Sequence, residues 1–329
     1  MKILCLAAAL AAATIAPVQA QDFPTRPVTH VFPWAPSGPA YAASQTVTER
    51  MSEILGETVG MQAKTGAGGV NAFLQAMAEP ADGYTTIDGW VAPLVLAPLS
   101  GRVEYDYEDF TPLHPLLSSP FAIMVRADDE RFPDFAAMQA FLEDNRGGLR
   151  YSAGDDLALP HQVTALVFRG QDMVARHIPY TGMPDAVKDL RGGILDFTVA
   201  NAGQYRANVG ELRVLAVLSD DPEASERLFD GAPIITDLLD TLDIGGLSMV
   251  GWTWWLVLKD TPEDRVAVLR DAMLAAKTDP AVVSRINELG FSMLSYEPDA
   301  YAETVATARD DLAAATDAID WEKSELAAR

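Results

Sequence analysis

The chain has 329 residues and carries 24 basic against 47 acidic side chains, a formal net charge of −23 at pH 7. This acidity argues against binding to nucleic acid or to anionic membranes, because both partners require basic patches. The length suits two domains, each with its own core. The one cysteine, Cys5, lies in the first 20 residues, so the chain that follows has neither a disulfide nor thiol chemistry.

Residues 1–20 have the pattern of an export signal. Lys2 precedes an apolar run from Ile3 to Ile15, and Val18-Gln19-Ala20 follows as a small-residue cleavage site. The run of about 13 residues is shorter than the roughly 20 that span a bilayer, which favours a cleaved signal over a retained membrane anchor. We therefore expect cleavage near Ala20 and, for an exported chain without disulfides, a bacterial periplasm.

Short strands alternate with helices along the rest of the chain. The stretch 28–41 predicts a strand, a loop rich in Pro, Ser and Gly, and the start of a helix with one apolar face: Ala40, Ala43, Val47, Met51 and Ile54. Further strands are expected at 57–62, 84–88, 121–125, 149–153, 174–178, 195–199, 212–218 and 249–258. Further helices are expected at 70–77, 134–145, from 160, 185–190, 262–276, 281–289 and 298–319. This order predicts an α/β fold in which helices cover parallel sheets.

The loop at 33–38 is a candidate anion site. A loop that leads into a helix exposes backbone N–H groups, and these groups together with the helix dipole bind anions. In open α/β sheets such a loop lies at the carboxyl end of a strand, where ligands bind. The alternative is an ordinary strand-to-helix turn without a ligand.

Several short motifs, in their order and spacing, resemble one known family over nearly the whole chain after the signal. They are Phe23-Pro24-Thr25-Arg26-Pro27-Val28, Pro33-Trp34-Ala35-Pro36-Ser37-Gly38, Gly66-Ala67-Gly68-Gly69, Pro80-Ala81-Asp82-Gly83-Tyr84-Thr85, Pro160-His161, Ile178-Pro179-Tyr180-Thr181-Gly182 and Asp189-Leu190-Arg191-Gly192-Gly193. The family is that of the periplasmic substrate-binding receptors of tripartite tricarboxylate transporters, also called Bug receptors.

The resemblance implies a type II periplasmic-binding fold, the Venus flytrap, with the ligand in a cleft between two α/β domains and with parallel-rich sheets. By analogy, domain 1 comprises 21–122 plus 248–329 and domain 2 comprises 123–247. The implied ligand is a small organic carboxylate, a di- or tricarboxylate or an aromatic acid. The implied partner is a membrane permease that receives this ligand from a monomeric receptor without a cofactor.

Candidate ligand-binding residues in domain 1 follow the first and third strands. Trp34, Tyr41 and Trp90 offer flat surfaces for a planar ligand, although core packing explains a tryptophan equally well. Ser37 and Gly38, next to Ala35, are expected to donate to a ligand carboxylate. Trp252, Trp254 and Trp255 are expected in the core, with one of them reaching the cleft at most.

Candidate residues in domain 2 lie on three loops: Asp155, His161, Tyr180, Thr181 and Asn201. Asp155 and its neighbour Asp156 would repel a bound carboxylate unless they face solvent or contact an ammonium group. They therefore leave open a zwitterionic or cationic ligand, to which aromatic faces add cation–π attraction. His161 either contacts the ligand or orients its loop.

Several positions depart from the family pattern. Tyr41 and Gln45 replace the family's Asp and Arg, and Pro39 removes one backbone N–H from the first loop. The scaffold motifs that are kept support the fold, whereas these changes at ligand-facing positions weaken any ligand carried over from the family.

An enzyme is not expected. The four histidines, His30, His114, His161 and His177, show no metal-ligand spacing, and no G-x-S-x-G motif occurs. A third class, a sensor that passes its ligand state to a signalling partner, has the same fold and is left open by the sequence.

Overall fold

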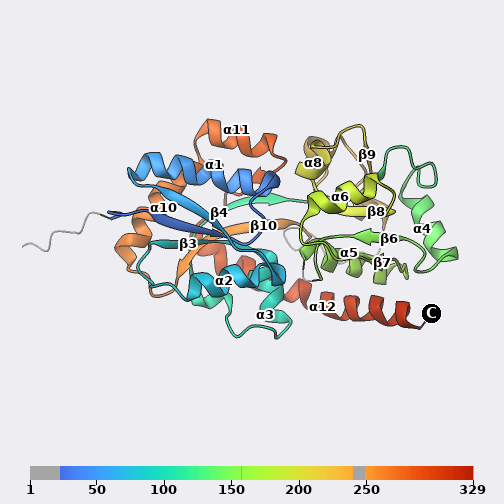
Figure 1. Cartoon of the computed structure of the whole chain (residues 1–329), viewed down its shortest axis with the longest axis horizontal. Helices are drawn as coiled ribbons and strands as arrows, with labels where there is room; N and C mark the ends of the chain where they lie inside the picture. Colours follow the sequence, from blue (N-terminus) through green and yellow to red (C-terminus); the bar gives the residue numbers. More distant parts are fainter. Residues whose placement is uncertain (1–22, 157, 240–248, 329) are drawn as a thin grey trace, which may run out of the picture.

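The computed structural model describes residues 23–156, 158–239 and 249–328 (Figure 1). The predicted export signal lies outside these residues. Within them, no helix combines the length and the apolar character that crossing a bilayer requires. The described chain forms two sheets, which follow one another along the long axis of the molecule in Figure 1.

Sheet 1 holds strands in the order β11-β4-β10-β3-β1-β2. Their bounds are β1 (Val28–Phe32), β2 (Val59–Ala63), β3 (Thr85–Trp90), β4 (Phe110–Ser119), β10 (Gly251–Leu258) and β11 (Ser292–Met293). Sheet 2 has the order β7-β6-β8-β5-β9. Its strands are β5 (Phe121–Arg126), β6 (Arg150–Ser152), β7 (Arg176–His177), β8 (Phe197–Asn201) and β9 (Leu212–Leu218).

The α/β class is confirmed. Both sheets are mixed, so parallel pairing is confined to some of the strands and does not extend through the sheets as expected. Strand β1 pairs parallel with β2 and β3, and β6 pairs parallel with β7 and β8. The remaining pairs, formed by β4, β5, β9, β10 and β11, are antiparallel. Pro120 alone separates β4 from β5. One nearly continuous extended segment thus passes from sheet 1 to sheet 2.

Helices cover both faces of each sheet (Figure 1). On sheet 1, α1 (Gly38–Leu55), α10 (Glu263–Lys277) and α11 (Pro280–Glu288) share one apolar cluster, while α2 (Val70–Met77), η2 (Ala92–Leu96) and α3 (Ala97–Leu99) lie on the other face. On sheet 2, α4 (Phe135–Asp144) and α5 (Leu159–Gly170) pack on one face, and α6 (Met183–Arg191) and α8 (Pro222–Phe229) on the other. The remaining short elements are α7 (Ala202–Arg206), α9 (Ile235–Leu238), η1 (Ala67–Gly69), η3 (Tyr107–Asp109) and η5 (Pro298–Ala300).

The last helix, α12 (Tyr301–Ala327), contacts elements of both sheets. Near its start, the Tyr301 ring packs against Trp254 of sheet 1 at 5.3 Å between centroids. Near its end, Glu322 accepts a hydrogen bond from the hydroxyl of Tyr151 in sheet 2 at 2.8 Å. The second half of α12 therefore packs on the predicted domain 2, although the expected division assigns the whole helix to domain 1.

The first described residues are held on the turn before β3. The backbone N–H of Thr25 donates to the Tyr84 hydroxyl at 3.0 Å, and the Arg26 guanidinium lies 3.7 Å from the centre of the Tyr84 ring. Gly83 has φ of +79°, and a Cβ there would lie 3.1 Å from the Phe23 ring. Two of the family-like motifs, at 23–28 and 80–85, thus pack against each other and have a structural role.

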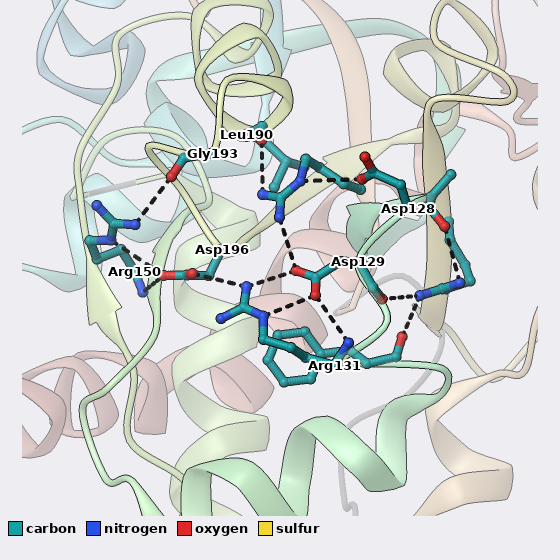
Figure 2. Close-up of polar contacts among 11 residues, drawn as sticks. Asp128, Asp129, Arg131, Arg150, Leu190, Gly193 and Asp196 are labelled. Atoms are coloured by element: carbon teal, nitrogen blue, oxygen red, sulfur yellow. Dashed lines mark hydrogen bonds and ion pairs between the residues drawn. The ribbon is translucent and has the colours of Figure 1, made fainter.

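A network of arginines and aspartates lies at the amino ends of β6 and β8 (Figure 2). Asp129, which is 5% exposed, accepts two hydrogen bonds from the Arg131 side chain at 2.9 and 2.7 Å. Arg131 also bonds Asp196 at 3.2 Å, and Asp196 accepts the backbone N–H of Arg150 at 2.9 Å. The Arg131 side chain lowers the pKa of Asp129 by hydrogen bonding. This network joins strand ends opposite to those that carry the predicted site.

Candidate functional site

The two sheets meet through loops at the carboxyl ends of their parallel strands. In sheet 1 these are the loops after β1 and β2, and in sheet 2 those after β6 and β8. The carboxylate of Asp155, after β6, accepts the backbone N–H of Gly68, after β2, at 3.1 Å. A Cβ built on Gly38, at the start of α1, would lie 3.8 Å from the amide nitrogen of Gln204 in α7. A ligand site between the two domains, as predicted, would lie at this junction.

The loop after β1 ends at an uncapped helix. Ser37, the N-cap of α1, is extended at φ −153° and ψ 161°, and its hydroxyl makes no capping hydrogen bond. Its backbone N–H instead donates to the carbonyl of Ala35 at 2.7 Å. Pro39 supplies no N–H, so the donors of the first turn belong to Gly38 and the residues after Pro39. Both Ser37 and Gly38 are exposed.

Two of the predicted aromatic residues form one wall beside this loop. Trp34 and Trp90 pack edge to face, with centroids 6.3 Å apart. Trp90 is 8% exposed, whereas Trp34 is half-buried. Tyr41 is also half-buried and packs edge to face on Phe32 at 5.4 Å.

The tryptophans of β10 lie in the core, as expected. Trp252, Trp254 and Trp255 each have an exposed fraction of 0%. None of the three therefore offers a surface to a ligand in this structure.

A buried polar network positions α1 on sheet 1. Asp88 of β3 is fully buried and accepts hydrogen bonds from the hydroxyls of Ser44 in α1, at 2.5 Å, and of Thr253 in β10. The His30 ring bonds Thr86 at 2.8 Å and lies 3.8 Å from the Asp88 carboxylate. Since the serine bonds the aspartate and not the histidine, the arrangement differs from a nucleophilic triad.

On the sheet 2 side, Asp155 and Tyr180 belong to two loops that are bonded to each other. The backbone N–H of Tyr180 donates to the carbonyl of Gly154 at 3.0 Å. Gly154 has φ of +96°, and a Cβ there would lie 2.7 Å from that of Ala158, so this turn requires glycine. The Tyr180 hydroxyl donates to the Asp189 carboxylate, which raises the pKa of Tyr180 to about 12. Thr181 is exposed on the same loop.

Asn201 ends β8 and begins α7. Its side-chain oxygen accepts the backbone N–H of Gln204 at 3.2 Å and so caps the helix. Directly behind it, a Cβ on Gly203 would lie 2.5 Å from the Pro39 ring. Close packing of α7 on the start of α1 thus depends on a glycine and a proline that face each other.

His161 lies below the surface, beside a second histidine. It is fully buried, its Nε2 is 3.1 Å from the Glu322 carboxylate, and its ring stacks on that of His177 at 3.7 Å between centroids. Burial and the neighbouring His161 lower the pKa of His177 to about 2. These contacts hold the His161 ring between Glu322 and His177.

A small polar hollow of about 110 Å³ lies elsewhere, against the amino ends of β1 and β3. Its lining includes Arg26, Thr29, Glu79 and Asp82. Arg26 and Asp82 already form an ion pair at 2.9 Å within it.

The structure thus brings Ser37, Gly38 and Asp155 to the junction and places Asn201 at the start of α7. Two residues there, Gly68 and Gln204, were not among the predicted site residues. The Gly66–Gly69 motif gave a signal for the first, since glycine-rich turns allow close backbone approach. Gln204 carries no such signal, because only the fold brings α7 to α1.

Comparison with known proteins gives a consistent result. Residues 43–319 match the model of the tripartite tricarboxylate transporter family receptors. A protein from Agrobacterium vitis, described as a UPF0065 protein in the TAR-I ttuE-ttuC' intergenic region, is 31% identical over 295 residues, covering 86% of this chain and 81% of that protein.

Two solved structures from Rhodopseudomonas palustris share the fold. Rpa4515 with adipate has a TM-score of 0.79 at 21% identity and covers 91% of this chain and 99% of its own. MatC with bound malate has a TM-score of 0.76 at 21% identity and covers 90% of this chain and 100% of its own.

Proposed function

This chain belongs to the tripartite tricarboxylate transporter receptor family, and from that premise we propose that it captures a small organic carboxylate between its two sheets and delivers it to a membrane permease. The observation that carries the proposal is the uncapped start of α1 at the junction with α7. Binding there favours the closed arrangement, because loops of both sheets then contact the same ligand.

The first carboxylate subsite of the proposal is formed by Ser37 and Gly38. The Ser37 hydroxyl is not used to cap its own helix, and the first-turn N–H groups have no partner within the helix. A carboxylate accepts hydrogen bonds from such groups and is further stabilised by the helix dipole. The net negative charge of the chain does not prevent carboxylate binding, because salt screens the repulsion from charges that lie more than about 8–10 Å away.

The shape of the ligand is proposed from two half-buried aromatic residues, Trp34 of the aromatic wall and Tyr41 of α1. Trp34 and Tyr41 are half-buried beside the first loop, so each retains surface that a ligand can cover. Malate and adipate, which the two Rhodopseudomonas proteins bind, are aliphatic dicarboxylates. We therefore place a dicarboxylate or an aromatic acid along the face of Trp34.

Asp155 supports a second candidate ligand class. Its carboxylate lies at the junction and is bonded to Gly68 of the other sheet. A zwitterionic or cationic ligand would direct its ammonium group to this carboxylate and its uncharged portion to the aromatic wall. Thr181 and Asn201 complete the proposed contacts on the sheet 2 side.

The proposal assigns a receptor and not an enzyme, acting in the periplasm as a monomer without a cofactor. Ser44, Asp88 and His30 have the residue types of a catalytic triad, but all three are fully buried between α1 and sheet 1. The Ser44 hydroxyl bonds the aspartate and not the histidine. This group supports the position of the first loop rather than chemistry on a substrate.

A thermal-shift screen of the chain from residue 21 tests the proposal. The panel comprises dicarboxylates, tricarboxylates, aromatic acids, amino acids and amines, since a ligand that binds only the folded state raises the melting temperature. The expected result is a rise with an acid, which is reduced in Ser37→Ala and kept in the control Ser324→Ala, an exposed serine on α12. A rise with amines alone would assign the second ligand class, and no rise with any compound would contradict the receptor assignment.

A further inference from the structure

We propose that Asp156, His161 and His177 form a binding site for a divalent transition-metal ion such as Zn²⁺, at the carboxyl end of β6 and separate from the carboxylate site. One ligand atom from each of the three residues lies within 4.8 Å of the others. They come from three elements that the fold alone assembles: the loop after β6, helix α5 and strand β7. Imidazole and carboxylate groups together are a usual ligand set for zinc.

His161 is already held in the manner of a metal ligand. Its Nε2 is bonded to the buried Glu322 carboxylate at 3.1 Å, and Glu322 in turn accepts the Tyr151 hydroxyl at 2.8 Å. A carboxylate on one ring nitrogen fixes the tautomer and leaves the other nitrogen, Nδ1, with its lone pair free. Among the described residues, His161 Nδ1 is buried and has no hydrogen-bond partner.

His177 and Asp156 complete the set from the outer side. The Asp156 carboxylate lies 3.6 Å from Nδ1 of His177, farther than a hydrogen bond. His177 Nε2 is likewise buried and without a hydrogen-bond partner in the described part of the chain. The Asp156 side chain is 52% exposed, so the site has an entry path from solvent.

Charge balance favours a cation at this point. Glu322 is 4% exposed, and a buried carboxylate requires a compensating positive charge. A divalent ion bound by two neutral imidazoles and Asp156, with Glu322 behind His161, gives a group of zero net charge. Such a site meets the electrostatic requirement without protonating either histidine.

Metal binding requires a small rearrangement. The two imidazole rings stack at 3.7 Å with 13° between their planes, and one ion cannot lie in both planes at once. Ligand distances of about 2.0–2.2 Å also require the three ligand atoms to approach to roughly 3.5 Å. A tilt of the His177 ring toward the exposed Asp156 achieves both, whereas His161 stays fixed by Glu322.

The test is a Co²⁺ titration of the untagged chain from residue 21 after chelator treatment. We expect one saturable equivalent, visible ligand-field absorption of a nitrogen–oxygen site, and displacement by Zn²⁺. Asp156→Ala should weaken binding about tenfold or more, by loss of a direct ligand. The matched control Asp128→Ala, an exposed aspartate outside the site, should leave the titration unchanged.

A second variant keeps the proposal testable if one substitution disturbs the fold. His177→Gln removes an imidazole whose side chain is 6% exposed, and circular dichroism checks that the variant remains folded. Loss of the Co²⁺ spectrum in both folded variants supports the site. Absence of saturable binding, or a spectrum that neither substitution changes, would overturn it.

Discussion

The carboxylate of Asp155 accepts the backbone N–H of Gly68 at 3.1 Å and so joins the loop after β6 in sheet 2 to the loop after β2 in sheet 1. These residues are 87 positions apart in the chain, and the contact exists only while the two sheets are close together. A hydrogen bond with one charged partner contributes about 1.5–3 kcal/mol, enough to bias an opening equilibrium.

Substitutions at Asp155 separate its hydrogen bond from its charge. Asp155→Asn keeps an acceptor for the Gly68 N–H and removes the charge, while Asp155→Ala removes both. We expect ligand affinity to be about fivefold weaker in Asp155→Ala than in Asp155→Asn, because about 1 kcal/mol of closing free energy is lost. Calorimetry with the ligand found in the screen measures this ratio, and equal dissociation constants would show that the contact does not assist closure.

Gly38 offers a second test, with a control on the same helix. Gly38 has φ of +83°, and a Cβ at this position would lie 3.8 Å from the Gln204 side chain. Gly56, at the other end of α1, has φ of +71° and nothing within 4 Å. Gly38→Ala and Gly56→Ala should each lower stability by about 1 kcal/mol, because both force alanine into a left-handed conformation.

Only Gly38→Ala should also weaken ligand binding, because only its new methyl group faces α7. Denaturant unfolding gives the stability of each variant, and calorimetry gives the affinity. A Gly56→Ala variant that loses affinity equally would assign the effect to strain in α1 as a whole.

Most of the elements could be predicted from the sequence because their apolar patterns are local. The predicted strand at 212–218 coincides with β9, and the helix at 70–77 coincides with α2. Strand β4 was missed, because Pro112 and Pro115 lack N–H groups and argue against a central strand. In the structure, register irregularities in the pairing with β10 accommodate these prolines, and the Pro112 carbonyl accepts the Arg270 side chain.

The site was less predictable because its contacts are between distant segments. The first loop could be anticipated, since a loop that leads into a helix is visible in the sequence. The facing of Gly203 and Pro39, and the stack of His161 on His177, depend on how the elements pack together. A search for short metal-ligand spacings in the sequence therefore did not detect the histidine pair.

Asp129 and its neighbour Asp128 provide a matched pair for the network of Figure 2. The Asp129 side chain is 3% exposed and bonds Arg131, whereas that of Asp128 is 87% exposed with one 3.4 Å contact to Arg126. Asp129→Ala should cost about 2–3 kcal/mol, because it removes the buried carboxylate that bonds both Arg131 and Arg126, while Asp128→Ala should cost less than about 0.5 kcal/mol. Urea unfolding at pH 7 measures both, and similar losses would show that burial of Asp129 is unimportant.

We predict that His114 of β4 causes a loss of folding stability in acid. Burial, together with Lys277 and Arg270, lowers its pKa from 6.5 to about 4. As the pH falls, His114 is therefore protonated in the unfolded chain before it is protonated in the folded chain. The contribution of neutral, buried His114 to the free energy of unfolding is fully present above pH 6.5 and is lost as the pH falls toward 4. The shift corresponds to about 3 kcal/mol when complete.

The variant His114→Gln should lose this part of the pH dependence. We expect the difference in unfolding free energy between pH 7.5 and pH 4.5 to be about 2 kcal/mol smaller in the variant than in the unsubstituted chain. A variant with the same pH profile would show that His114 titrates normally in the folded state.

The central claim, capture of a small carboxylate at the start of α1, is tested most directly by calorimetric titration of the chain from residue 21 with malate, adipate and an aromatic acid. We predict binding of one acid at 1:1 stoichiometry with a micromolar dissociation constant, about −8 kcal/mol, and a clear loss of affinity in Ser37→Ala but not in Ser324→Ala. Binding of none of the acids, or binding that Ser37→Ala leaves unchanged, would contradict the claim.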